Sequence, residues 1–187
     1  MVKNSLTYLI LLILIASCQT KVDSLQYLGE IQKSDYDLTK SKEFNSNTFK
    51  VTYEPIEKRI LSRNANITEK EYHDLSKELD NELFFKFQIA SENNLNQLIT
   101  GQIDYFSHFI KNRFALIINE KDTVQPELFQ LEHTYGLTPY ITYLISFNPE
   151  SEVNSFSFYY DDEVFGVGLL KYHYSESQLS KLPVISW

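Results

Sequence analysis

Cysteine, methionine and tryptophan each occur only once in this chain of 187 residues, and glycine and proline occur five times each. The one cysteine, Cys18, has no second cysteine to pair with, so the domain must fold without an internal disulfide. The apolar stretch Leu6–Ala16 is well below the roughly 20 residues that a membrane-spanning helix needs. The sequence therefore excludes a disulfide framework and argues against a membrane-spanning helix of ordinary length.

Basic charge is also scarce. Lys and Arg number 17 against 25 Asp and Glu, which gives a net charge of −8. An acidic chain is repelled by phosphate groups, so we expect no nucleic-acid partner and no basic face for anionic lipid. The sequence contains no G-x-S-x-G, P-loop, G-x-G-x-x-G, H-E-x-x-H or EF-hand pattern. We therefore predict no cofactor and assign no catalytic or metal-binding residue.

The first 18 residues have the layout of a secretory signal peptide, with Lys3 before an apolar run that ends at small residues. The run closes on Ile15-Ala16-Ser17-Cys18, which resembles the bacterial lipobox: an aliphatic residue and two small residues before a cysteine. The resemblance covers residues 1–18 only. It implies cleavage before Cys18 and acylation, palmitate included, of the Cys18 sulfur and amino group. An uncleaved signal anchor is the alternative.

Several acyl chains on one residue would hold the protein at a membrane, since each buried methylene contributes about 0.8 kcal/mol. Lys3 is the only charged residue before Cys18, so the mature chain would carry a net charge of about −9. The resemblance implies a lipid-anchored protein of the bacterial cell envelope. It favours the outer membrane, because Gln19 is not the aspartate that marks inner-membrane retention in some bacteria. Whether the domain faces the periplasm or the outside stays open.

We predict three segments: a signal peptide over 1–17, the lipidated cysteine and a polar tether over 18–47, and a single β-rich globular domain over 48–187. Residues 19–47 are rich in Lys, Ser, Asp, Gln and Asn, a composition that buries little apolar surface. An irregular first element packed on the domain is an equal alternative, and a short helix near Leu25–Ile31 fits either interpretation.

The fold class predicted is α+β, an antiparallel sheet or sandwich-like domain with one or two inserted helices. The 13 Tyr and 13 Phe favour pleated surfaces. Thr48–Glu54 alternates as a strand, while Thr68 and Glu71 form a capping box at the start of a helix. A second helical pattern covers 92–111 with a possible joint at Gly101. Strands are expected over 83–89, 114–119, 127–135, 140–147, 155–160, 164–174 and 183–187, while 56–63 could be a helical turn or a strand.

Four histidines and one acidic turn are the candidates for chemistry. Asp104 with His108, and Glu69 with His73, are each four residues apart on a predicted helix, a spacing that a metal pair or an oriented base would use. Each of these pairs is explained more simply as an ordinary pair on a helix surface. His133 and His173 fall in predicted strands, where a half-buried, hydrogen-bonded histidine is the simpler interpretation. Asp161–Glu163 offers three carboxylates in a predicted hairpin turn, where a solvated tip is a simpler explanation than a calcium site.

The aromatic residues near the C-terminus offer a platform for sugar rings or peptides, although cross-strand packing is the simpler role. They are Tyr135, Tyr140, Tyr143, Tyr159, Tyr160, Tyr172, Tyr174 and Trp187. The sequence favours a non-catalytic binding or assembly module at the envelope, with the membrane and an envelope protein or glycan as partners. The alternatives are a hydrolase that uses His108 or His173 with a carboxylate, and a carbohydrate-binding lipoprotein.

Overall fold

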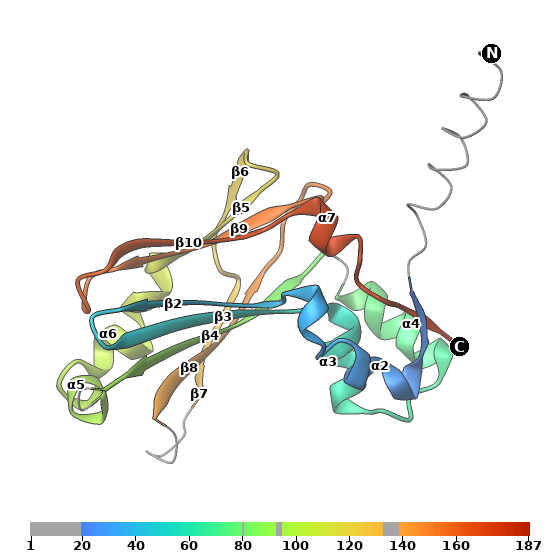
Figure 1. Ribbon diagram of the computed structural model, residues 1–187, viewed down its shortest axis with the longest axis horizontal. Helices are drawn as coiled ribbons and strands as arrows, with labels where there is room; N and C mark the ends of the chain where they lie inside the picture. Colours follow the sequence, from blue (N-terminus) through green and yellow to red (C-terminus); the bar gives the residue numbers. More distant parts are fainter. Residues whose placement is uncertain (1–19, 80, 93–94, 133–138) are drawn as a thin grey trace, which may run out of the picture.

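Two antiparallel sheets face one another in a sandwich-like arrangement (Figure 1). The structure is a computed structural model that describes residues 20–79, 81–92, 95–132 and 139–187. One sheet has five strands in the order β2-β3-β4-β8-β7, and the other has four in the order β10-β9-β5-β6. The strands are β2 (Thr39–Phe44), β3 (Asn47–Glu54), β4 (Leu83–Ser91), β5 (Phe114–Ile118), β6 (Asp122–Val124), β7 (Leu128–Glu132), β8 (Tyr140–Phe147), β9 (Phe156–Asp162) and β10 (Gly168–Tyr174). The predicted α+β class is confirmed.

The main core lies between these two sheets and is largely aromatic. Alternation along β4 and β9 directs Phe85, Phe87, Phe158 and Tyr160 into it, and all four are almost fully buried. Phe87 and Tyr160 lie 4.9 Å apart between ring centroids, within the range of favourable aromatic pairs. Aromatic side chains from both sheets therefore fill the space that aliphatic residues fill in many sandwiches.

Helices occupy the two ends of the sandwich, as Figure 1 shows. At one end, a second cluster of buried side chains joins the N-terminal helices to the C-terminal strand. The elements at this end are β1 (Lys21–Asp23), α2 (Ser24–Glu30), the 3-10 helix η1 (Ser34–Tyr36), α3 (Ile56–Arg63), α4 (Glu69–Glu78) and β11 (Val184–Ser186). Towards the other end lie α5 (Leu95–Gly101), α6 (Ile103–Ser107) and the 3-10 helix η2 (Phe109–Arg113), while α7 (Glu176–Leu179) precedes β11. No helix within the described residues is long and apolar enough to cross a bilayer.

The predicted polar tether is wrong for residues 21–47. This segment forms β1, α2, η1 and β2, and it buries Tyr27, Ile31, Tyr36 and Leu38 in the second cluster. Most of its polar residues lie on the outside, while these four residues share the second cluster with side chains of α3, α4 and β11 at distant positions in the sequence. The alternative of a first element packed on the domain describes the fold better, and α2 matches the short helix expected near Leu25–Ile31.

Two other expectations changed in detail. Residues 56–63, left open between a helical turn and a strand, form α3. Residues 184–186 do not join the sandwich, because β11 pairs in parallel with β1 as a separate two-stranded sheet. The predicted joint near Gly101 is present, since α5 ends at that residue and α6 begins at Ile103.

Candidate functional site

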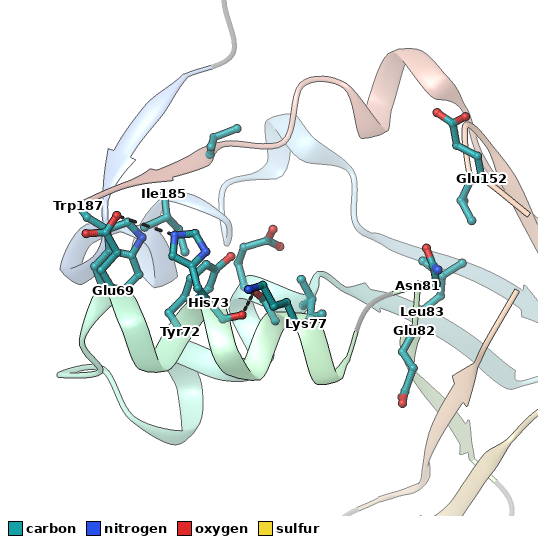
Figure 2. Close-up of a pocket in the computed structure, with 15 residues that line it drawn as sticks. Glu69, Tyr72, His73, Lys77, Asn81, Glu82, Leu83, Glu152, Ile185 and Trp187 are labelled. Carbon is teal, nitrogen blue, oxygen red and sulfur yellow. Dashed lines mark hydrogen bonds and ion pairs between the residues drawn. The ribbon is translucent and has the colours of Figure 1, made fainter. Parts of the chain in front are cut away.

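A groove of about 890 Å³ lies between α4 and β11 at the end of the sandwich that holds the second cluster (Figure 2). Its volume is within the range of ligand-binding pockets. The lining combines apolar, aromatic and charged side chains from α3, α4, the start of β4, the segment before β9, and β11. These residues are Ile56, Glu57, Glu69, Tyr72, His73, Ser76, Lys77, Asn81, Glu82, Leu83, Glu152, Val153, Val184, Ile185 and Trp187.

The position of α4 is set by its own N-terminus. Thr68 accepts a hydrogen bond from the Glu71 N–H at 3.4 Å, and the Glu71 carboxylate accepts from the Thr68 N–H at 3.0 Å. This confirms the predicted capping box. From that start the helical repeat places Glu69 and Tyr72, and then His73 and Ser76, on one side of the helix. All four line the groove.

Trp187 closes one end of the groove against α4. Its ring centroid lies 5.2 Å from that of Tyr72, which is 9% exposed, while Trp187 itself is 43% exposed. Figure 2 shows both rings beside Glu69 and His73 at this end. The site therefore offers an apolar aromatic surface that water still reaches.

Glu57, near the start of α3, contributes a half-buried carboxyl group to the groove. Burial raises the pKa of this carboxyl, because water is kept from its charged form. Burial also raises the pKa of Tyr27, Tyr53 and Tyr72, and the Glu57 charge adds to each of these shifts. Within the described residues no ion pair satisfies Glu57.

Tyr27 is fully buried, and its hydroxyl has no hydrogen-bond partner among the described residues. Tyr27 belongs to the second cluster, and the charge of the half-buried Glu57 acts on its hydroxyl. Sequence reasoning missed both, because their burial arises from helices that are far apart in the chain. The preceding Pro55 and Ile56 give no local sign that the glutamate is shielded from water.

The histidines singled out from the sequence do not converge. His73 lies in the groove with its Nε2 3.8 Å from Oε1 of Glu69, and both side chains are exposed. His108 follows α6, where its N–H donates to the Asp104 carbonyl at 2.9 Å in an ordinary helical bond. His173 lies on β10, and His133 falls outside the described residues. A site with two histidines and an acid is therefore not formed by the described histidines.

His173 does have a partner that the sequence analysis did not name. Its Nδ1 lies 3.0 Å from the hydroxyl of Ser157 on the neighbouring strand β9. These two residues pair directly in the β9–β10 register, which explains their contact. The pair lies outside the groove between α4 and β11.

The acidic residues Asp161–Glu163 stabilise the connection between β9 and β10. Asp162 belongs to β9, is only 6% exposed, and accepts hydrogen bonds from the N–H groups of Val164, Phe165 and Val167 and from the Tyr160 hydroxyl. Asp161 and Glu163 lie beside Arg113. The hairpin turn predicted at Asp161–Glu163 is thus corrected to a turn that begins after Asp162, because Asp161 and Asp162 belong to β9. Within the described ranges no three His, Cys, Asp or Glu side chains are placed to hold a metal ion.

The aromatic residues proposed as a sugar platform are mostly core residues. Tyr143, Tyr160, Tyr172 and Tyr174 are at most 2% exposed. The hydroxyls of Tyr143, Tyr172 and Tyr174 donate to main-chain carbonyls, as in Tyr172 to Phe49 at 2.9 Å, and that of Tyr160 donates to Asp162. Tyr140 and Tyr159 are half-buried, and Tyr135 falls outside the described residues. Of the seven that the structure describes, only Trp187 lines the groove.

Comparison with known proteins gives no family. No protein-family model and no curated protein matches the chain. Among solved structures, a DUF4426 family protein from Pseudomonas aeruginosa PAO1 has a TM-score of 0.37 at 9% identity, over 74% of this chain and 92% of that chain. A novel protein of unknown function from Burkholderia pseudomallei K96243 has a TM-score of 0.40 at 10% identity, over 86% and 93% respectively. Likenesses this weak carry no functional inference.

Proposed function

We propose that this protein is a lipid-anchored, non-catalytic binding module of the bacterial cell envelope, and that the groove between α4 and β11 binds its partner. The observation that carries the proposal is the composition of the groove: an aromatic wall of Tyr72 and Trp187 beside a carboxyl, Glu57, that no ion pair satisfies among the described residues. A concave site with apolar walls and a few polar groups is the usual form of a binding site.

The distribution of the histidines supports a binding role over hydrolysis. The three described histidines lie on or next to α4, α6 and β10, and only His73 lines the groove. The Ser157 and His173 pair has the atoms of a nucleophile and a base. Ser157 is however 3% exposed, which leaves its hydroxyl little access to a substrate.

The position of Cys18 supports a site close to the membrane. Three residue steps separate Cys18 from Lys21, the first residue of β1, and a chain of that length spans at most about 11 Å. Because β1 pairs with β11, which borders the groove, an acylated Cys18 would keep the groove next to the lipid headgroups. The partner would then be a protein or glycan held at the same surface.

Two measurements test this proposal separately. Intact-mass spectrometry of the protein purified from a bacterial envelope is expected to show a chain that begins at an acylated Cys18, and an intact Met1 or a free thiol would contradict the anchor. Binding is tested with a photo-crosslinking amino acid in place of Lys77 in the groove, and in place of the exposed Lys171 on β10 as the control. We expect a discrete adduct from position 77 only. Equal adducts from both positions would remove the groove as the binding site.

A further inference from the structure

The strand β11 has one paired edge and one open edge. The Val184 N–H donates to the Thr20 carbonyl at 3.0 Å, and Val184 pairs with Lys21 in the parallel register. Both main-chain polar groups of Val184 therefore point towards β1, and those of the next residue, Ile185, point away from it. The register therefore leaves the Ile185 N–H and carbonyl unpaired with β1, and among the hydrogen bonds outside the helices and strand ladders none from the described residues reaches them.

The open edge of β11 borders the groove. The lining includes Val184, Ile185 and Trp187 of this C-terminal segment but no residue of β1. Val184 is exposed on the outer face of the short sheet while Ile185 packs on the second cluster, so the groove contacts β11 from the side. Figure 2 shows α4 running below this strand, with the side chains of both elements directed into the space between them.

The charge of the groove selects the kind of segment that would pair there. Its lining holds four glutamates, against one lysine and one histidine. Glu57 is half-buried, and neither it nor Glu152 has an ion pair within the described residues. A carboxylate that is partly shielded from water is stabilised by a cation that enters the same site, so basic side chains complement this groove and acidic ones are repelled.

We propose that the ligand of the groove is an extended peptide segment that carries lysine or arginine and adds to the open edge of β11. This inference rests on the groove being the binding site proposed above. Main-chain hydrogen bonds to Ile185 would supply affinity, as in other cases of strand addition. Alternate side chains would face the Tyr72 and Trp187 wall, and a basic side chain would reach Glu57. The segment would belong to another envelope protein with an exposed basic strand or tail.

The test uses the purified full-length protein in detergent and synthetic seven-residue peptides of alternating valine and lysine, labelled with a fluorophore for anisotropy. We expect the lysine peptide to bind at least tenfold more tightly than the same peptide with glutamate in place of lysine. Methylation of alternate peptide N–H groups is expected to weaken binding at least tenfold in one register and little in the other, because only one set faces β11. Equal effects of the two registers would overturn strand addition.

The side-chain assignment is tested with Glu57→Gln and, as the matched control, Glu69→Gln at an exposed position in the same groove. Glu57→Gln should remove most of the preference for lysine over glutamate peptides, and Glu69→Gln should keep most of it. The reverse order would overturn the role of Glu57. If neither peptide binds while the crosslinker at position 77 still captures a partner, the peptide inference fails and the binding groove stands. If neither peptide binds and position 77 captures no partner, the groove is not the binding site.

Discussion

The rings of Tyr72 and Trp187 lie 5.2 Å apart between centroids at an interplanar angle of 50°, and they connect α4 to the C-terminal strand. Tyr72 also belongs to the second buried cluster, which joins α2, α3 and α4. This aromatic contact therefore joins the two walls of the candidate groove. Loss of this contact should loosen the site as well as the fold.

Trp187→Ala should lower the free energy of unfolding by about 1–2 kcal/mol. This is less than the loss expected on truncating a fully buried tryptophan, because the side chain is 43% exposed. Urea denaturation followed by circular dichroism measures it, since the only tryptophan is lost. The matched control is Leu25→Ala, whose side chain is 69% exposed, with an expected change within about 0.5 kcal/mol. Equal losses in the two variants would contradict a structural role for the Tyr72 contact.

Asp162→Ala should be among the most destabilising substitutions of a polar residue, with a loss of about 2–4 kcal/mol. The reason is that three main-chain N–H groups and the Tyr160 hydroxyl would lose their shared acceptor. Asp161→Ala is the control: this exposed carboxylate lies 3.8 Å from Arg113, so we expect a loss below about 0.5 kcal/mol.

Calcium should leave the melting temperature of the wild-type protein unchanged, and a clear rise would show that the acidic turn binds the ion.

The raised pKa of Glu57 predicts that the free energy of unfolding depends on pH. Because its pKa is raised in the folded state, the protonated carboxyl is favoured by folding, and folding loses free energy as the pH rises from the ordinary carboxyl range, about 4, through the raised value. Tyr27, Tyr53 and Tyr72 around it stay neutral over that range, since burial raises the pKa of each. Glu57→Gln cannot ionise, so it should gain stability relative to the wild type between pH 4 and pH 7.

Chemical denaturation of Glu57→Gln and of the wild type at several pH values measures this effect. Glu69→Gln is the control, because the exposed Glu69 side chain should give the same difference from the wild type at both ends of the range, apart from its weak pair with His73. A Glu57→Gln difference that stays constant with pH would show that the Glu57 carboxyl is not perturbed in the folded state.

The parts of the fold that depend on local sequence were predictable. The alternation of Phe49, Val51 and Tyr53 matches β3, and the capping box at Thr68 and Glu71 starts α4 where expected. These patterns arise within a few residues, where backbone geometry and side-chain periodicity decide the outcome. The antiparallel sheets followed from several such strands in succession.

The groove was not predictable, because distant segments form it. Glu57 is half-buried where α2 and α4 pack against α3. The edge of β11 that carries the Ile185 main-chain groups is the one that does not pair with β1. The burial of residues 21–47 has the same origin. The Tyr174 hydroxyl donates to the Leu38 carbonyl at 3.0 Å across 136 positions, and no local pattern announces such a contact.

The boundary of the folded domain gives the last prediction. A deletion of residues 1–19 keeps every described element and should unfold cooperatively, at the same urea concentration as the longer chain. A deletion of residues 1–47 removes β2 and the buried Tyr27, Ile31, Tyr36 and Leu38. Each such side chain contributes about 1.5–3 kcal/mol of burial, so their sum is comparable with the 5–15 kcal/mol, roughly, that stabilises a whole domain. The shorter chain should lack the near-ultraviolet circular dichroism of a folded protein, whereas a removable tether would leave both spectra and both urea midpoints the same.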